Sequence, residues 1–216
     1  MKIEALEVSG LYPALYGMRD PMDSWAQSDT TWLTMDGPYH DPAFNTKYCM
    51  EVGEKDKELS VRLQKAGPEH CKHLRMVNVY ANITAPRYWW TEFDTYRAGV
   101  EKVSCSTMHK LMSHPLTFDD FEHDELFEPT FQEQVIDAIN RCIKVFKDSD
   151  DPGLRKVLFR GVVQFLPQSF LQKRTVMMSY AALRNIYRQR QGHKLIEWHQ
   201  FCEWVESLPE SWMITE

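Results

Sequence analysis

The spacing of apolar residues predicts a helix over residues 54–66. Leu59, Leu63 and Ala66 recur there at helical spacing, and Gly67 is placed to end the helix. A short turn in the sequence GPEH follows this segment.

A pattern with a period of two residues occupies residues 77–84. In VNVYANIT, apolar residues alternate with more polar ones, which is typical of a strand that buries one face. Pro86 then suits the first turn of a helix. The stripe predicted for that helix consists of Trp89, Trp90, Phe93 and Arg97. The chain therefore predicts a strand that leads directly into a helix.

The second half of the chain has a mostly helical pattern. Thr130 and Glu133 form a TxxE sequence, typical of a capping box, ahead of an apolar stripe. The stripe consists of Val135, Ile139, Cys142 and Phe146. Further helices are predicted over residues 154–165, 180–191 and 194–208, with a strand near residues 175–176.

The first fifty residues show no sustained period of either kind. They are rich in Pro, Gly, Asp and aromatic residues, which favours short elements joined by ordered loops. No internal repeat and no low-complexity linker divides the sequence. We therefore expect a single domain over residues 1–216.

Composition and charge narrow the class of protein. The chain has 216 residues, 43% of them hydrophobic, so it can bury a sizeable core. It lacks an apolar stretch of 18 residues and a signal-peptide pattern at its start, so we expect a soluble cytoplasmic protein. With 25 Lys and Arg against 31 Asp and Glu, it is poorly suited to polymeric nucleic acid. A few arginines in one pocket can still hold a small anionic ligand.

The cysteines and histidines do not form a recognisable metal or disulfide pattern. The five cysteines are scattered without a CxxC pair, which favours free thiols. His70 and His73 have HxxH spacing, but histidines at i and i+3 of a helix are common without a metal, so we expect no metal site. The sequence contains no Walker loop, GxGxxG or GxSxG motif.

Between residues 60 and 208, the predicted strand ends in the pair Ala85 and Pro86, and the segment WTEFDTYR that follows ends in Arg97. This region resembles the flavin-dependent thymidylate synthases, in which a strand ends in a CP or AP pair and an ARQWxRHR helix follows, with Arg97 at the position of its last arginine. The family's GHES turn is similar to GPEH, which keeps Glu69. The signature RHRxxSxNExSxRY is largely lost here, and its second serine and its tyrosine fall on Ser106 and His109.

The resemblance continues without a gap from residue 163 to residue 190. Pro167, Leu183, Asn185 and Arg190 match the proline, a leucine, a flavin-contacting asparagine and a nucleotide-holding arginine of the family. Glu197 matches the acidic residue of the family's AQWEIR helix. Three family residues, two arginines and an asparagine, are replaced by Val163, Ala181 and Ser179.

The resemblance implies an α+β fold, with a mixed, mostly antiparallel sheet flanked by helices and a helical C-terminal portion. Members of the family make dTMP from dUMP with a folate one-carbon donor and reduced flavin, and no protein side chain is thought to attack the base. The cofactor does the difficult chemistry while the protein binds and orients. FAD, NADPH and a homotetramer that binds FAD where subunits meet are therefore implied.

The resemblance also assigns roles to seven residues. It implies that Arg190 holds the nucleotide phosphate, and that Glu92 and Ser106 orient the base. The implied flavin contacts are Arg97, Asn185, Tyr96 and His109. Apart from Tyr96, each has an alternative interpretation as an ordinary surface or loop residue, because charged and amide side chains are mostly exposed in proteins.

Two hypotheses on function follow. The first is flavin-dependent one-carbon transfer to a pyrimidine deoxynucleotide such as dUMP. The second is a catalytically degenerate relative that acts as a nucleotide-binding or assembly protein without flavin. The second hypothesis arises because the eroded signature removes several charge-assisted contacts to phosphates.

Overall fold

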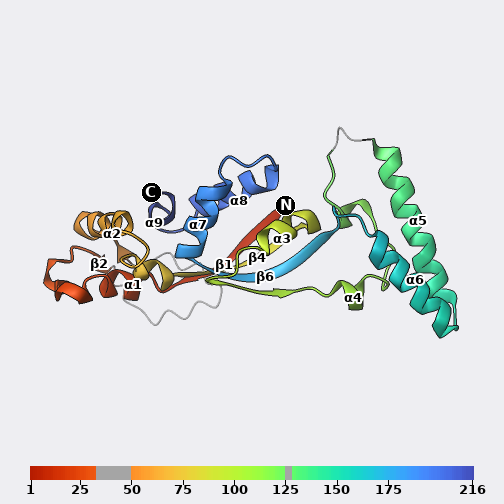
Figure 1. Ribbon diagram of the computed structural model, residues 1–216, viewed down its shortest axis with the longest axis horizontal. Coiled ribbons are helices and arrows are strands. Elements are labelled where there is room, and N and C mark those ends of the chain that lie inside the picture. The colour runs from red at the N-terminus through yellow and green to blue at the C-terminus, as the bar shows by residue number, and fades with distance from the viewer. Residues whose placement is uncertain (33–49, 125–127) are drawn as a thin grey trace. The chain divides into compact units, whose positions relative to one another are not determined.

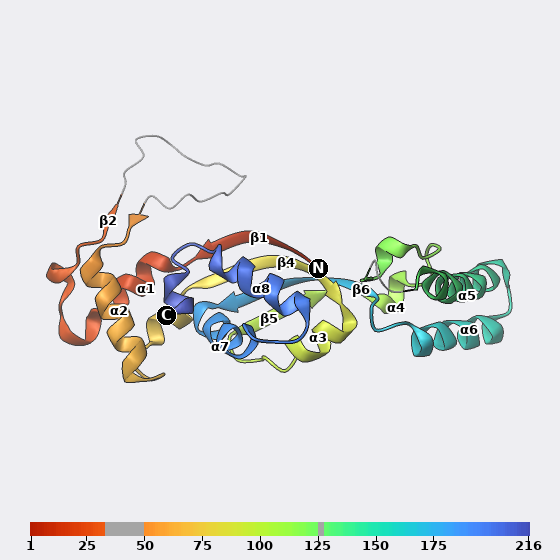
Figure 2. The same cartoon turned by 90° about the horizontal axis from the view of Figure 1, so that it is seen from above.

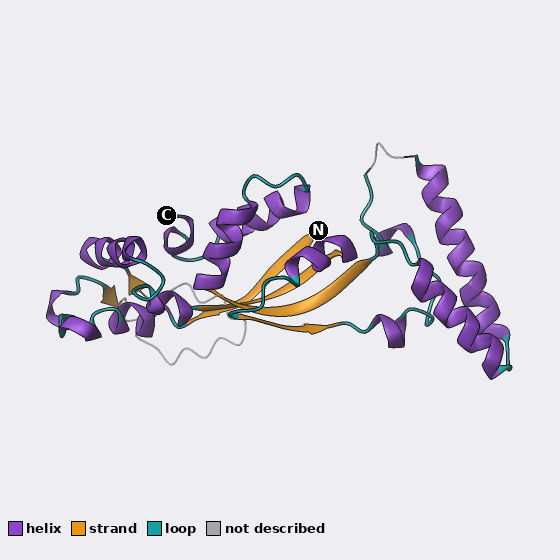
Figure 3. Ribbon diagram, in the orientation of Figure 1, coloured by secondary structure: helices purple, strands orange, loops and turns teal. Residues whose placement is uncertain are grey.

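A computed structural model describes residues 1–32, 50–124 and 128–216, and the segment MDGPYHDPAF within the predicted N-terminal loops lies outside them. Two sheets are present in the described residues (Figure 3). The larger has four strands in the order β1 (Lys2–Ser9), β4 (Asn78–Pro86), β6 (Leu171–Ser179) and β5 (Val100–Ser104). The smaller pairs β2 (Thr31–Trp32) antiparallel with β3 (Met50–Glu51).

Hydrogen bonds at both ends of the central strands show that they run antiparallel. At one end the Tyr180 N–H donates to the Val77 carbonyl, and at the other the Arg87 N–H donates to the Phe170 carbonyl. Residue numbers thus rise along β4 as they fall along β6, which defines an antiparallel pair. The predicted, mostly antiparallel sheet is confirmed.

The predicted helices are confirmed, most of them to within two residues. Glu54–Ala66 (α2) begins and ends where the pattern indicated. The other long helices are α5 (Pro129–Asp148), α6 (Pro152–Phe165), α7 (Tyr180–Arg190) and α8 (Ile196–Glu206). Shorter ones are α1 (Leu11–Gly17), α3 (Arg87–Phe93), α4 (Thr107–Lys110) and α9 (Trp212–Thr215), with 3-10 turns η1 (Asp20–Met22), η2 (Trp25–Gln27), η3 (Lys72–Arg75) and η4 (Phe118–Asp120). No helix in the described ranges is long and apolar enough to cross a membrane.

The chain divides into two compact units. Unit 1 comprises Met1–Lys2, Thr84–Thr95 and Ser104–Arg174, and unit 2 comprises Ile3–Ile83, Tyr96–Val103 and Thr175–Glu216. Strands β4 and β6 each contribute residues to both units. The single domain expected from the sequence therefore stays a prediction.

Unit 1 has its core around the hairpin of α5 and α6 (Figure 1). The predicted stripe of α5 faces this core, where Ile139 is buried and Val135, Cys142 and Phe146 are partly buried. The predicted capping box at Thr130 and Glu133 is wrong, because the N-cap of α5 is Glu128 and Thr130 lies within the first turn of the helix. Pro129 occupies its first turn, where a missing N–H costs no helical hydrogen bond.

Unit 2 has its core between its strands and the C-terminal helices. Helices α7 and α8 lie over one face of the strands (Figure 2). Val79 and Ala81 of β4 are buried while Tyr80 between them is exposed, so the predicted alternation is confirmed. Ser179 caps α7, since its Oγ accepts a hydrogen bond from the Ala182 N–H. The fully buried side chains here include Trp198, Phe201, Leu183, Ile186 and Tyr180.

Two details around α3 differ from the sequence interpretation. Pro86 is the last residue of β4 rather than a helical residue, and α3 ends at Phe93. Trp89, Trp90 and Phe93 are buried as predicted, but Arg97 lies in the following turn with an exposed side chain. The expected position of Arg97 on the helix stripe is therefore wrong.

Candidate functional site

Arg190, at the end of α7, is held by two aromatic side chains of unit 2. Its Nε donates a hydrogen bond to the Tyr96 hydroxyl oxygen at 2.8 Å. Its guanidinium carbon lies 4.5 Å from the ring centroid of Trp198 and 5.5 Å from that of Tyr96. Both distances are within the range of cation–π contacts. The direction of the guanidinium is therefore fixed by the fold.

Hydrogen bonds connect Arg190 to Asn185 on the same helix. The Tyr96 hydroxyl donates to Gln189 Oε1 at 3.0 Å, and Gln189 Nε2 donates to Asn185 Oδ1 at 2.9 Å. Asn185 and Gln189 are exposed, and Tyr96 is buried. The chain Asn185, Gln189, Tyr96, Arg190, which we call the α7 chain, thus presents an amide and a guanidinium from one helix.

Arg97 is adjacent in sequence to Tyr96 of the α7 chain, but its side chain is exposed whereas that of Tyr96 is buried. It follows Tyr96 directly and belongs to unit 2. Its side chain is exposed, and its carbonyl accepts the Val100 N–H at the start of β5. Arg97 is thus available to an external ligand at the surface of the turn.

The other three predicted site residues belong to unit 1. Glu92 is half-buried on α3, Ser106 is exposed at the start of α4, and His109 is a residue of α4. The Ser106 carbonyl accepts the Lys110 N–H at 3.3 Å, which fixes the backbone of this turn. Of the seven predicted residues, Tyr96 and Arg190 are joined by a direct hydrogen bond, and Asn185 is linked to them through Gln189.

Arg174 in unit 1 was missed by the sequence interpretation. Its guanidinium carbon lies 4.1 Å from the ring centroid of Trp90, and its Nη1 donates to Asp94 Oδ1 at 2.7 Å. Its Nε also donates to Gln172 Oε1 at 3.1 Å. Arg174 lies 80 residues from Asp94, so no local spacing could have revealed this pairing.

Unit 2 also contains a cavity of about 570 Å³ between α1, α2 and η3. Arg62, His70 and Lys72 supply basic side chains to its lining, and Glu69 supplies an acidic one. The chain as a whole is acidic, with a formal charge of -6. Such a local excess of basic groups suits an anionic ligand. We call this space the basic cavity.

His73 borders the basic cavity from a buried position. Its side chain is 3% exposed, and its Nε2 is hydrogen-bonded to Ser60 Oγ at 2.8 Å. Burial, together with the nearby Arg184 guanidinium, lowers the pKa of His73 to about 4. His73 is therefore neutral at pH 7. In the described ranges its Nδ1 has no hydrogen-bond partner, and no cluster of three or more metal-ligating side chains occurs.

Two solved structures share the architecture of the whole chain. One is the flavin-dependent thymidylate synthase ThyX from Helicobacter pylori complexed with FAD and dUMP, with a TM-score of 0.71 and 16% sequence identity. The other is ThyX from Helicobacter pylori with FAD and dUMP, with the same TM-score and 14% identity. Each similarity covers 100% of this chain and 98% of the ThyX chain.

The chain has the fold of a flavin-dependent thymidylate synthase. The family resemblance inferred from residues 60–208 is confirmed at the level of the fold, and it extends to the whole chain. No protein-family profile and no curated protein sequence matches the chain. Sequence identity this low establishes the ThyX-like fold, and function must be argued from the side chains.

Proposed function

We propose that this protein transfers a one-carbon group to a pyrimidine deoxynucleotide such as dUMP in a flavin-dependent reaction. The observation that carries the proposal is the α7 chain. It fixes the Arg190 guanidinium and the Asn185 amide on one helix of a ThyX-like fold. A preorganised guanidinium suits a phosphate, because its planar fork matches two phosphate oxygens.

The available donors fit a flavin nucleotide. The exposed guanidinium of Arg97 and the amide of Asn185 can donate to oxygen and nitrogen atoms of FAD, with Tyr96 and His109 as further flavin contacts. When bound and reduced, the flavin would supply the hydride. The protein would hold the nucleotide phosphate through Arg190 and orient the base through Glu92 and Ser106.

The basic cavity is a second place in unit 2 that suits a phosphorylated ligand such as FAD. Arg62, His70 and Lys72 are grouped at one place in an acidic chain, as the binding of a phosphorylated ligand requires. Its acidic residue, Glu69, is the one that the GPEH turn shares with the family. We further propose a cytoplasmic homo-oligomer, a tetramer by analogy, that uses a folate one-carbon donor and NADPH.

A second candidate function is nucleotide binding or assembly without flavin. Three replacements favour it. Val163, Ser179 and Ala181 stand where the family has polar or charged residues. Ser179 is moreover buried as the N-cap of α7, where its Oγ accepts a hydrogen bond from the Ala182 N–H. In this alternative the scaffold persists while the cofactor is lost.

The absorbance spectrum of the purified full-length protein separates the two candidates. The flavin-dependent proposal predicts a yellow protein, or a colourless one that binds added FAD in a calorimetric titration. It then predicts dTMP formation from dUMP, a folate one-carbon donor and NADPH. Protein that neither contains nor takes up FAD overturns the flavin-dependent proposal, and dUMP binding by that protein supports the second candidate.

A further inference from the structure

Three aromatic side chains form a row on the surface of unit 2. Tyr12 and Tyr16 lie one turn apart on α1, with ring centroids 5.9 Å apart, and Trp25 on η2 lies 5.8 Å from Tyr16. The side chains are 45%, 48% and 38% exposed, respectively. Large aromatic rings that stay exposed side by side are characteristic of binding surfaces. We call this group the aromatic row.

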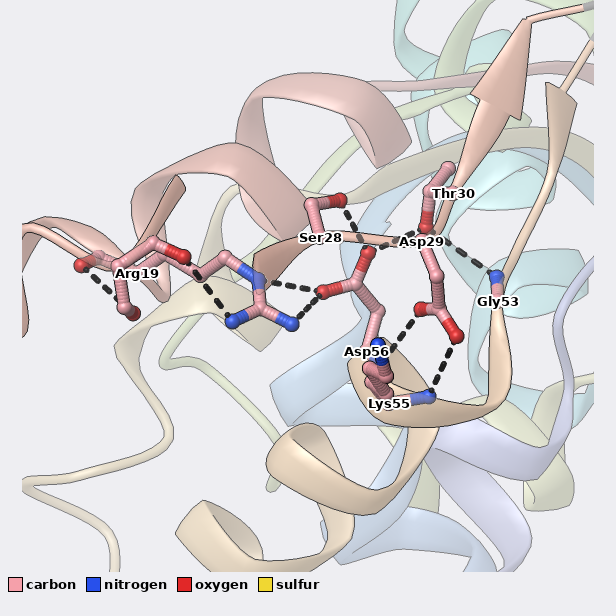
Figure 4. A network of polar contacts seen from close by, with 8 residues as sticks. Arg19, Ser28, Asp29, Thr30, Gly53, Lys55 and Asp56 are labelled. Carbon is pink, nitrogen blue, oxygen red and sulfur yellow. Dashed lines mark hydrogen bonds and ion pairs between the residues drawn. The ribbon is translucent and has the colours of Figure 1, made fainter. Parts of the chain in front are cut away.

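Asp56 forms polar contacts with Arg19, Ser28 and Thr30, on either side of Trp25 in the sequence (Figure 4). Arg19 donates through Nε to Asp56 Oδ1 at 2.6 Å and through Nη1 to the Ser24 carbonyl at 3.2 Å. Trp25 Nε1 donates to Asp20 Oδ1 at 2.9 Å. The ring of Trp25 is thus positioned before any ligand binds, which lowers the entropy cost of binding.

The aromatic row lines one side of a small cavity of about 160 Å³. Ser28 and Thr30 also line it, and both hydroxyl groups donate their hydrogen to Asp56 Oδ2. Their oxygen atoms can therefore only accept hydrogen bonds from a ligand. The cavity offers aromatic faces and acceptors, which carry negative potential.

One charged side chain, that of Arg19, lines the cavity. Between residues 10 and 32 the chain has three aspartates, Asp20, Asp23 and Asp29, and one arginine. That arginine, Arg19, is neutralised by the buried carboxylate of Asp56, at 2.5 Å. The carboxylate of Asp20, which accepts the hydrogen bond from Trp25 Nε1, thus places a negative charge beside the aromatic row.

We propose that the aromatic row and its cavity bind an alkylated ammonium group. Cations are attracted to the faces of Trp and Tyr rings, and several rings lining one cavity are typical of sites for quaternary ammonium groups. The volume suits such a compact group rather than a nucleotide. The group can belong to a free amine such as choline or to a methylated lysine of a peptide.

Titration of the full chain with choline chloride tests the proposal, by isothermal calorimetry and by ligand-observed NMR. We expect saturable binding, and at least ten-fold weaker binding of 3,3-dimethyl-1-butanol, the uncharged analogue of choline. A trimethyllysine peptide that binds more tightly than choline would identify a peptide as the source. Equal binding of the uncharged analogue, no choline binding, or binding of methyl β-glucoside in its place overturns the proposal.

Variants locate the binding to the aromatic row. Trp25→Ala should weaken choline binding at least ten-fold, whereas Trp25→Phe, which keeps an aromatic face, should weaken it less. Tyr80→Ala, at an exposed tyrosine of β4 in the same unit, is the matched control and should leave binding unchanged. Because Trp25→Ala can disturb the turn, Tyr16→Ala provides a second test. Wild-type affinity in both ring-deleting variants refutes the assignment.

Discussion

The Tyr96 hydroxyl and the Arg190 Nε are 2.8 Å apart, although the two residues are separated by 94 positions in the chain. This hydrogen bond ties the turn after α3 to the end of α7. A guanidinium held in this way loses little freedom when it binds a phosphate. The geometry of the proposed nucleotide site therefore depends on a residue outside the helix that presents it.

Replacing Arg190 with alanine should abolish dUMP binding, measured by calorimetry. It should also lower the free energy of unfolding by about 1 to 2 kcal/mol, because the contacts with Tyr96 and Trp198 are lost. Arg188→Ala makes the same charge change at an exposed residue of the same helix and should leave binding intact. Unchanged dUMP affinity in Arg190→Ala would contradict the assigned role.

Replacing Tyr96 with phenylalanine should show how much the positioning of Arg190 contributes to ligand binding, because the charge of Arg190 is kept. The substitution keeps the ring beside Arg190 but removes the hydroxyl that connects Arg190 with Gln189. We expect stability to fall by about 1 kcal/mol, the usual net value of one hydrogen bond. Ligand affinity should fall less than in Arg190→Ala, and an equal fall would show that the hydroxyl itself binds the ligand.

The buried His73 predicts a dependence of stability on pH. Its pKa falls from 6.5 to about 4 on folding, so the folded state binds the proton less well than the unfolded state. The contribution of neutral His73 to the free energy of unfolding is therefore complete above pH 6.5, and it is lost as the pH falls from 6.5 to 4. The loss should reach about 3 kcal/mol at pH 4 and below.

Urea denaturation at pH 7, 5.5 and 4 measures this effect. His73→Gln keeps a polar group beside Ser60 but removes the titration, so its stability should decline less over the same range. His114→Gln, at an exposed histidine, is the matched control and should follow the wild type. Parallel pH curves for wild type and His73→Gln would contradict the prediction.

The ion pair between Arg19 and Asp56 should be important for the stability of unit 2. Both side chains are buried, and Asp56 also accepts hydrogen bonds from Ser28 and Thr30. Asp56→Asn leaves the buried Arg19 charge without its partner, which typically costs about 3 to 5 kcal/mol. Glu54→Gln breaks an exposed pair with Lys57 on the same helix and should change stability by less than about 1 kcal/mol. Thermal denaturation of both variants measures the difference.

Two glycines should respond in opposite ways to alanine. Gly10 has φ 86°, and an added Cβ would lie 2.1 Å from the Met76 carbonyl oxygen. Gly10→Ala should therefore destabilise the protein by more than about 1 kcal/mol. Gly161 lies within α6, where an added Cβ has no neighbour within 4 Å, so Gly161→Ala should stabilise it by about 0.5 to 1 kcal/mol. Equal melting temperatures for the two variants would contradict this contrast.

The sequence by itself determined those features that depend on contacts within one element. In α2 and β4 the apolar residues repeat at the spacing of a helix and of a strand, and both patterns agree with the structure. The resemblance in the C-terminal part likewise indicated the ThyX-like fold. These signals are local because each residue's burial repeats with the geometry of its own helix or strand.

Only the tertiary structure decided which distant residues meet. Strands β1 and β5 were not predicted, because edge strands pair on one side and bury few side chains, which leaves no clear alternation. The pairing of Arg174 with Trp90, the hydrogen bond from Arg190 to Tyr96 and the aromatic row also escaped the sequence interpretation. Each depends on the path of the chain between separate elements, which local spacing does not encode.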